Sequence, residues 1–328
     1  MQRRGLLAGV LPGLVLPGLV SRPAWAQEDY PARAIRVVLG QSPGGSNDTT
    51  LRVIGPRMTR ALGQTVVIEN RPGAGSNVAT DQVVRSIPDG YTLLGGTVGG
   101  MTVNPTLFGN LPFDPLTDLT PISITVNVLN VLVVPSSRPW HSVQDLIAAA
   151  RARPEQLSYG SSGVGGAGHL GGALLDQMAG IRTTHVPYRG GGPQMNDLLA
   201  GRMDFSFASA PTALPHIASG RLRALAVPTP QRSDLLPDVP TVAESGGLPG
   251  YQVANWYALL GPARLPAAIV DRLNAAVRAA LTDPEVTQIL AGHGLEPTPS
   301  SPEELGRFMR EETEKWAGII RASGAQPG

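Results

Sequence analysis

Two loops of small residues are the parts of this 328-residue sequence best suited to hold a ligand. The first loop, Gly40–Asn47, follows the apolar stretch Ile35–Leu39, and the residues after it carry apolar side chains at helical spacing. The second loop, Ser161–Gly168, has the same surroundings. Backbone N–H groups in such a loop, at the N-terminus of a helix, attract an anion. Two such loops far apart in the sequence predict one anionic ligand held between two lobes.

The charged and titratable side chains beside these loops each have two interpretations. Asp48 either complements the dipole of the helix in whose first turn it lies or fixes the first loop, and the sequence leaves both open. His169 is expected to cap, pack or orient the second loop rather than to act as a base. Arg71 and Arg189 flank glycine-rich loops and could meet a carboxylate with two hydrogen bonds each, although arginines in loops are usually solvated.

Two glycine motifs match enzyme signatures, and both fail on chemistry. Gly40–Gly44 fits G-x-S-x-G, the nucleophile elbow of α/β-hydrolases, which would make Ser42 a nucleophile. The next residue should then donate a backbone N–H to the oxyanion hole, but Pro43 has none. Gly163–Gly168 fits the dinucleotide motif G-x-G-x-x-G, but the next predicted strand, 184–188, does not end in the required acidic residue. A serine hydrolase using Ser42 is therefore an alternative with a specific objection.

Composition excludes several classes of protein. The sequence has no cysteine, and its five histidines lack the spacing of metal ligands, so we expect no disulfide, no cofactor and no metal. The net charge of +1 does not indicate binding to nucleic acid or to an anionic membrane. The length allows two domains.

The N-terminal segment has the pattern of a secretory signal peptide. Arg3 and Arg4 precede the apolar run Gly5–Val20, which two prolines interrupt and which is short for a membrane span. Ala24-Trp25-Ala26 follows as a cleavage site, so residues 1–26 are predicted to be removed and the protein to reach the periplasm. The paired arginines also suit the twin-arginine route, and the sequence does not decide between the two export routes.

Alternating strand and helix patterns predict an α/β fold with parallel, doubly wound sheets, in which loops after the strands share one edge. The stretch 122–134 is expected to cross from one lobe to the other, and 256–261 to return, with Trp256 and Tyr257 packed at the hinge. Ser76 is expected to cap a helix, and 95–100 to form a loop. The other predicted strands are 35–39, 65–69, 91–94, 157–160, 184–188, 205–207 and 222–227, and the helices are about 48–62, 76–86, 143–151, 169–178, 194–200, 266–281, 284–291 and 302–322.

An ordered series of motifs runs through the chain after the signal segment. Among them are ENRPGAGSN at Glu69–Asn77, PDGYTLL at Pro88–Leu94, HVPYRGGGP at His185–Pro193 and LPDVPTVAESG at Leu236–Gly246. In these motifs and their order, the chain resembles the periplasmic substrate-binding proteins of the tripartite tricarboxylate transporter system, the Bug-type family.

The resemblance implies a type II periplasmic-binding fold: two lobes joined by two crossing strands, closing on ligand like a hinge. Lobe I would comprise 27–125 and 258–328, and lobe II 126–257. It also implies a monomeric, non-enzymatic receptor that binds a small organic carboxylate and delivers it to membrane transporter subunits; a ligand sensor for a signalling partner is an alternative. The implied ligand-binding residues are Gln41, Ser42, Gly44, Gly45, Ser46, Asp48, Thr97, Ser161, Ser162, Gly165, Gly166, Ala167, His169 and Ala208.

Three positions depart from the pattern of the family. Relatives usually have an aromatic or apolar residue in place of Gln41, hydroxyl residues in the loop around Ala167, and often an aspartate in place of Ala208. An amino-acid ligand needs an acidic partner for its ammonium group. Together the three departures predict an altered ligand, which is larger, more apolar or without an amino group. The loss of an aspartate at 208 disfavours an amino group, unless another acid such as Asp48 pairs with it. The sequence does not name the ligand.

Overall fold

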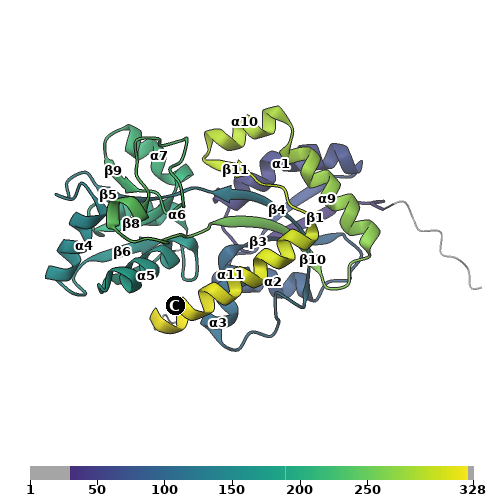
Figure 1. Cartoon of the computed structure of the whole chain (residues 1–328). Helices are drawn as coiled ribbons and strands as arrows, with labels where there is room; N and C mark the ends of the chain where they lie inside the picture. The colour runs from purple at the N-terminus through teal and green to yellow at the C-terminus, as the bar shows by residue number, and fades with distance from the viewer. Residues whose placement is uncertain (1–29, 189, 324–328) are drawn as a thin grey trace, which may run out of the picture. The chain divides into compact units, whose positions relative to one another are not determined.

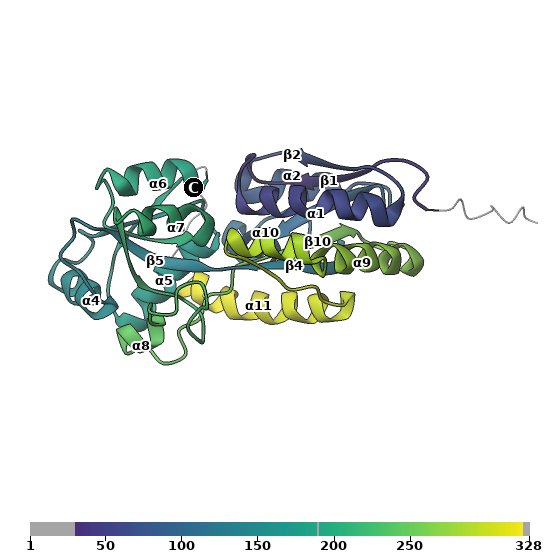
Figure 2. The same ribbon diagram turned by 90° about the horizontal axis from the view of Figure 1, so that it is seen from above.

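The computed structural model describes residues 30–188 and 190–323. The predicted signal peptide, residues 1–26, and Arg189 lie outside the described residues. From Pro31 onward the chain forms one compact unit with two β-sheets, each covered by helices (Figures 1 and 2). The two-lobed α/β fold predicted from the sequence is therefore confirmed.

The first sheet combines strands from the two ends of the chain, in the order β11-β4-β10-β3-β1-β2. Its strands are β1 (Ile35–Leu39), β2 (Val66–Asn70), β3 (Thr92–Thr97), β4 (Leu119–Val128), β10 (Trp256–Pro262) and β11 (Leu295–Pro297). The helices of this half are α1 (Ser46–Leu62), α2 (Asn77–Val84), α3 (Asn104–Phe108), α9 (Ala267–Leu281), α10 (Pro284–Gly292) and α11 (Pro302–Ser323), with a 3₁₀ turn at Ala74–Ser76 and a π-helical turn, η2, at Gly99–Val103.

The second sheet is built from the middle of the chain, in the order β7-β6-β8-β5-β9. Its strands are β5 (Asn130–Pro135), β6 (Ser158–Ser161), β7 (Thr184–Pro187), β8 (Phe205–Ser209) and β9 (Leu222–Ala226). Its helices are α4 (Val143–Ala152), α5 (Ala167–Ala179), α6 (Gly191–Leu199), α7 (Ala210–Ala218) and α8 (Val242–Gly246).

Both sheets are mixed, which corrects the expectation of wholly parallel sheets. The βα units do give parallel pairs, β1 with β2 and β3, and β6 with β7 and β8. However, β10 runs antiparallel to β3 and β4, and β5 runs antiparallel to β8 and β9. The chain leaves the first sheet through β4 and returns to it through β10. Because β10 enters from the opposite direction, it runs antiparallel to β3 and β4.

The predicted crossing strand is two strands, β4 and β5, that separate at Leu129 and belong to different sheets. The return passage lies just before β10, and all of β10 belongs to the first sheet. The two passages are tied together where they meet: Val128 N–H donates to the Asn255 carbonyl (2.7 Å), and the Asn255 side chain donates to the Asn130 amide oxygen (2.7 Å). This pair of strand ends is the connection between the sheets.

Glycines explain why β3 continues through Gly95 and Gly96 to Thr97, in the region 95–100 that the sequence analysis took for a loop; η2 begins directly afterwards, at Gly99. A Cβ atom on Gly95 would lie 2.2 Å from Leu39 Cδ2 and 2.7 Å from Leu51 Cδ1. A Cβ atom on Gly96 would lie 2.5 Å from Leu260 Cδ1. These residues are therefore glycine because neighbouring elements pack directly on the strand. The predicted loop is wrong, since local composition does not reveal such packing.

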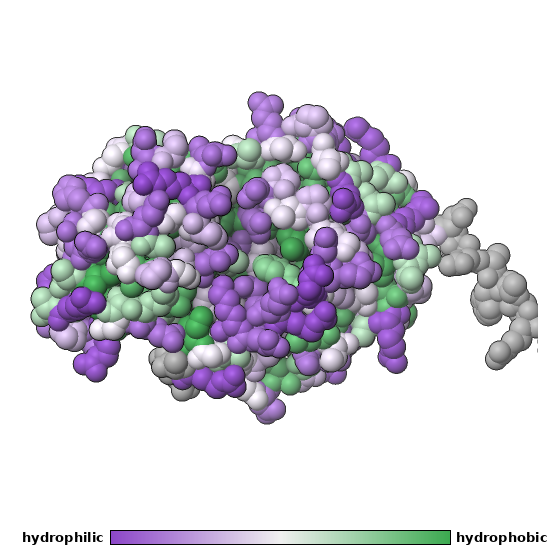
Figure 3. All heavy atoms as spheres, in the orientation of Figure 1, coloured by the Kyte–Doolittle hydropathy of each residue, from purple (hydrophilic) through white to green (hydrophobic). Residues whose placement is uncertain are grey.

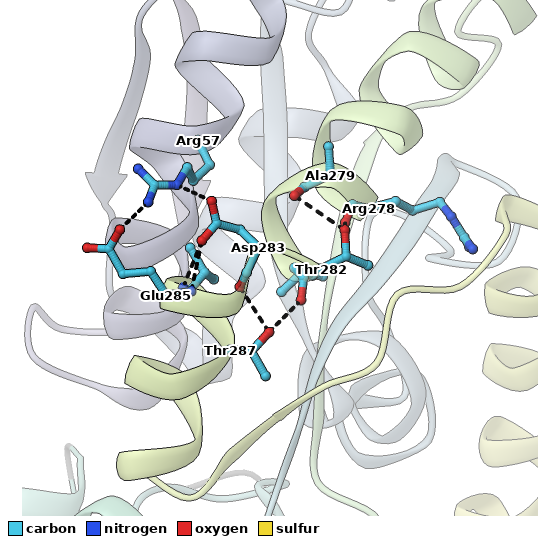
Figure 4. Close-up of polar contacts among 9 residues, drawn as sticks. Arg57, Arg278, Ala279, Thr282, Asp283, Glu285 and Thr287 are labelled. Carbon is cyan, nitrogen blue, oxygen red and sulfur yellow. Dashed lines mark hydrogen bonds and ion pairs between the residues drawn. The ribbon is translucent and has the colours of Figure 1, made fainter.

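Two long helices hold the first half together. The apolar face of α1 predicted from spacing, Leu51, Ile54, Met58 and Leu62, is buried. Arg57 on the same helix pairs with Asp283 (2.6 Å) and Glu285 at the start of α10 (Figure 4). Helix α11 packs on β4 and η2 of the first half and also on α5 of the second, as its path in Figures 1 and 2 shows.

The surface seen in Figure 3 mixes hydrophilic and hydrophobic residues rather than gathering the latter in one large area. In the described ranges, no helix has the length and apolar character needed to span a membrane.

Candidate functional site

The two predicted loops have nearly the same backbone geometry, although they belong to different sheets. Gly44 and Gly165 occupy the left-handed region, with φ of +80° and +77°, where glycine carries no steric penalty. Each loop contains a turn closed by one backbone hydrogen bond. The closing bonds run from Gly45 N–H to the Ser42 carbonyl and from Gly166 N–H to the Gly163 carbonyl, and both measure 3.3 Å.

Each turn leads directly into a helix. Gly45 is the N-cap of α1, with φ and ψ of −71° and 160°, and Gly166 is the N-cap of α5, with −73° and 163°. No side chain among the described residues caps either helix. Helix geometry leaves the first backbone N–H groups without an acceptor in their own helix, including those of Ser46 and Ala167. Both helix starts thus offer donors and a positive dipole end to an anion.

Asp48 fixes the first loop through three donors. Its carboxylate accepts Gly44 N–H (2.9 Å), Arg52 Nε (2.9 and 3.0 Å) and the Asn70 side-chain amide (3.0 Å). The Asn70 amide also donates to the Gln41 carbonyl (3.0 Å), which holds the start of the same loop. Of the two interpretations left open by the sequence, this geometry supports the second: Asp48 is the anchor of the loop.

The electrostatic setting of Asp48 keeps it ionised. Burial opposes its negative charge, but hydrogen bonds from Arg52, Gly44 and Asn70 outweigh burial and hold the pKa below its usual value. Only 3 % of the residue is exposed. A carboxylate with this many donors already in place is poorly suited to receive the ammonium group of a ligand.

His169 holds the second loop in the corresponding way. Its Nδ1 accepts Gly165 N–H (3.0 Å), so this nitrogen carries no proton. The imidazole stacks on His185, with ring centroids 4.1 Å apart. Burial lowers the pKa of His169 to about 4, so the ring is neutral near pH 7. A neutral, buried imidazole with this hydrogen bond fixes the loop and is not placed to act as a base.

His185 supports the same loop from β7. The Ser161 hydroxyl donates to the Gly163 carbonyl (2.9 Å), and therefore accepts the Nε2–H of His185 (2.7 Å). Burial, and secondarily the neighbouring His169, lower the pKa of His185 to about 3. Ser161 is fully buried, so its hydroxyl acts within the loop. The sequence did not indicate this role of His185 because α5 separates it from Ser161 along the chain.

Tyr257 joins the first loop, although it was expected only to pack at the hinge. Burial raises the pKa of its hydroxyl to about 12, and hydrogen bonds from Ser46 and Gln41 act in the opposite direction. The Gln41 Oε1 atom is buried and has no hydrogen-bond partner within the described ranges. Gln41 thus places a polar side chain beside Ser46 and Tyr257, at a position where the family resemblance implies an apolar or aromatic residue.

Beside the first loop, Ser76 and Thr97 make contacts that differ from their expected roles, and Asn104 joins them as a buried residue that the sequence did not single out. The Ser76 hydroxyl donates to the Gly40 carbonyl (3.3 Å), and a Cβ on Gly40 would lie 2.3 Å from Ser76 Cβ. Ser76 is the N-cap residue of α2, as expected, but its side chain bonds to Gly40 and does not cap the helix. The Thr97 hydroxyl accepts Gly100 N–H (3.2 Å). Asn104 is fully buried and donates to the Gly75 carbonyl (2.9 Å).

The remaining predicted residues divide between the surface and the core. Ser42, Gly44 and Ser162 are exposed at the loops. Ala208 is 1 % exposed in β8, opposite Val131 of β5, and lies in an apolar cluster with Met195 and Leu198. Arg71, one of the two arginines considered for a carboxylate, pairs with Glu69 at 2.5 Å. No cluster of side chains suited to a metal ion occurs within the described ranges.

Comparisons with known proteins agree with this geometry. Residues 50–325 match the family described as the tripartite tricarboxylate transporter family receptor. Protein BugT of Bordetella pertussis is 35% identical over 300 residues, which is 91% of this chain and 92% of BugT.

Two solved structures from Rhodopseudomonas palustris are similar in fold as well as in sequence. Rpa4515 with adipate has a TM-score of 0.85 and 37% identity, and the match covers 92% of this chain and 100% of that one. MatC with bound malate has a TM-score of 0.82 and 31% identity, and the match covers 89% of this chain and 100% of that one. The chain therefore belongs to the tripartite tricarboxylate transporter receptor family, a family of solute receptors and not of enzymes.

Proposed function

We propose that this protein is an exported receptor that binds a small organic carboxylate between its two lobes and delivers it to the membrane subunits of a tripartite transporter. One observation carries the proposal: two uncapped helix N-termini, each preceded by the same glycine turn, one from each half of the molecule. A carboxylate placed between them would accept backbone N–H groups from both sides. Residues 1–26 would be cleaved on export, and the mature receptor would act as a monomer in the periplasm.

The proposed lobes are 27–125 with 258–328, and 126–257. The passages at Val128–Asn130 and Asn255 would form the hinge, because these are the segments that connect the two sheets. Most of the proposed ligand-binding residues belong to the two glycine loops and to the first turns of α1 and α5, whereas Thr97 belongs to β3 and Ala208 to β8. A receptor useful to a transporter would bind at about micromolar affinity, or roughly −8 kcal/mol.

The ligand class proposed is a carboxylate without an amino group. Adipate and malate, the acids bound by Rpa4515 and MatC, are both of this kind. In this chain Asp48 is already engaged by Arg52, Gly44 and Asn70, and Ala208 supplies no charge. An ammonium group would thus lose its hydration without gaining a free acidic partner at either position.

A thermal-shift screen of the mature protein, from Gln27 onward, tests the proposal. The protein is unfolded, dialysed and refolded first, so that no co-purified ligand remains. Ligand at a hundred times its dissociation constant should stabilise the fold by about 2.7 kcal/mol. Dicarboxylates should shift the melting temperature, and the matched α-amino dicarboxylates of equal length should not. A shift with amino acids alone would contradict the ligand class, and no shift with any carboxylate would contradict the receptor function.

A further inference from the structure

The second glycine loop touches the opposite half of the molecule through its backbone. A Cβ atom on Gly99, in the π-helical turn η2, would lie 2.8 Å from the Gly165 carbonyl oxygen. A Cβ atom on Gly165 would lie 3.0 Å from Asn104 Oδ1 and 3.4 Å from Val103 Cγ1. A side chain at Gly99 would therefore clash with the backbone of Gly165, and a side chain at Gly165 would press on the side chains of Asn104 and Val103.

The surface on which Gly165 rests is rigid. We call it the Gly165 seat, formed by Gly99, Val103 and Asn104. The Asn104 side-chain nitrogen donates to the Gly75 carbonyl (2.9 Å) and to Asn77 Oδ1 (2.7 Å), which fixes the orientation of the amide. Its Oδ1 is buried, faces Gly165 and has no hydrogen-bond donor in the part of the chain that the structure describes. The two hydrogen bonds of its nitrogen thus fix the Asn104 amide with its oxygen directed at the second loop.

Helix α11 supports both sides of this contact. It packs on η2 and α3, which carry the seat, and on α5, which begins directly after the second loop (Figure 1). Trp316 of this helix is fully buried in the core cluster that also contains Val103 and Ala167. Helix α11 therefore packs behind both the Gly165 seat and the second loop. A change in the distance between the seat and the loop would disturb this buried packing.

We propose that the Gly165 seat sets the spacing between the two ligand-binding loops and thereby the affinity for the ligand. This inference rests on the proposed function. Gly99 and Asn104 are positioning residues: they act on the ligand through Gly165, which fixes where the N-terminus of α5 stands relative to that of α1. The close packing allows the two helix N-termini to approach one carboxylate from both sides.

The first test is Gly99→Ala, with Gly100→Ala as its matched control. Gly99 does not have a positive φ, so alanine introduces no left-handed strain and adds only its methyl group against Gly165. A Cβ on the adjacent Gly100 would meet Thr97 Oγ1 at 3.4 Å, an ordinary contact. We expect Gly99→Ala to weaken binding of the dicarboxylate found in the screen at least tenfold, which is about 1.4 kcal/mol. Gly100→Ala should stay within twofold of the natural protein.

A second pair approaches the contact from the loop. Gly165→Ala would place its methyl group against Asn104, and it also carries the strain of φ +77°. Gly63→Ala, at φ +74° with open space around the Cβ, carries the same strain away from the site. Weaker binding in Gly165→Ala, but not in Gly63→Ala, would place the effect at the second loop and its contacts rather than in a general loss of stability from a strained φ. Equal affinities in this pair would overturn the proposal.

Hydrogen exchange of the ligand-free proteins, followed by mass spectrometry, gives a readout that does not depend on the ligand. Amides of 161–170 should exchange faster in Gly99→Ala than in the natural protein and in Gly100→Ala, because the loop is displaced from its seat. If the natural protein binds no carboxylate but this exchange difference is seen, the seat stands and the proposed function fails. If Gly99→Ala exchanges and binds like the natural protein, the seat is not a spacing contact.

Discussion

The two ligand-binding loops use the same turn and the same anchor position but different anchor chemistry. In each loop a glycine N–H donates to the side chain four residues later, Gly44 to Asp48 (2.9 Å) and Gly165 to His169 (3.0 Å). Four residues beyond Asp48 stands Arg52, which pairs with the carboxylate. The corresponding residue beyond His169 is the buried Ala173. A charged anchor thus occurs where a cation accompanies it, and a neutral one where none does.

This difference shows what the fold requires of the position. The turn needs one acceptor for the glycine N–H, and either a carboxylate or an imidazole supplies it. The charge of the anchor is decided by its surroundings, because an unpaired buried carboxylate would carry a large desolvation cost. The first loop should therefore be stable over a wide pH range, whereas the second should weaken when its imidazole is protonated.

The largest effect is expected when the charged anchor is removed. Asp48→Ala removes the buried acceptor that Gly44 N–H, Arg52 and Asn70 share, so the three groups are no longer tied together. We expect the free energy of unfolding, measured with urea, to fall by about 2–3 kcal/mol, and the affinity for the dicarboxylate to fall roughly 100-fold. The loss of affinity follows because the first loop is no longer held at the start of α1.

Asp81→Ala is the matched control for this variant. Asp81 pairs with Arg85 at the same spacing of four residues, but on the surface of α2. Surface pairs of this kind contribute little, so its melting temperature should stay within about 1 °C and its affinity unchanged. If Asp48→Ala were as mild as Asp81→Ala, the anchor role of Asp48 would be wrong.

The sequence was sufficient to locate the loops but not the contacts that hold them. In each case strand, glycine turn and helix follow one another directly along the chain. The helix starts near Ser46 and Ala167 therefore follow from apolar spacing and glycine content alone. The stack of His169 on His185 depends on the pairing of β6 with β7, which no local pattern states. The contact of Asn104 with Gly165 depends on the packing of the two halves.

The second largest effect is expected at acid pH, where the neutral anchor His169 should lose its contribution to stability before the charged anchor Asp48 does. An unfolded chain protonates His169 as the pH falls through about 6.5, whereas the folded protein resists until about pH 4. The stability contributed by the neutral imidazole is therefore complete above pH 6.5 and is lost as the pH falls toward 4. For His169 alone the loss is on the order of 3 kcal/mol, and His185, with a pKa of about 3, adds in the same direction.

One nearby carboxyl works against this trend. Burial raises the pKa of Asp176 to about 6, although hydrogen bonds from Thr183 lower it. Its contribution to stability is complete below about pH 3.8 and is lost as the pH rises through 6. The measured profile is the sum of both, so a variant is needed to isolate the imidazole. The buried Tyr159 and Tyr251 have pKa values raised far above this range and do not contribute.

His169→Asn isolates the contribution of the imidazole. Its side-chain oxygen can still accept Gly165 N–H, but it does not titrate. Urea unfolding at pH 7, 6, 5 and 4 should show a stability difference between the natural protein and His169→Asn that shrinks or reverses as the pH falls. Parallel profiles for the two proteins would show that the buried imidazole does not control the acid response of the second loop.

The smallest effect is expected at a helix that has its own cap, α10, which serves as a contrast to α1 and α5. Asp283 caps this helix by accepting the N–H groups of Glu285 (3.0 Å) and Val286 (3.3 Å), and it also pairs with Arg57 (Figure 4). Its N-terminus is thus satisfied within the chain, and it should have no part in binding an anion. Asp283→Ala should lower the melting temperature by about 2–4 °C.

Asp283→Asn separates the cap from the ion pair, because asparagine caps a helix about as well as aspartate but carries no charge. Its melting temperature should fall by less than that of the alanine variant. The dissociation constant for the dicarboxylate should stay within twofold in both, when measured by calorimetry. A larger loss of affinity would mean that the contact between α1 and α10 also positions the first loop. The presence or absence of a side-chain cap would then not explain why α1 and α5 bind the ligand and α10 does not.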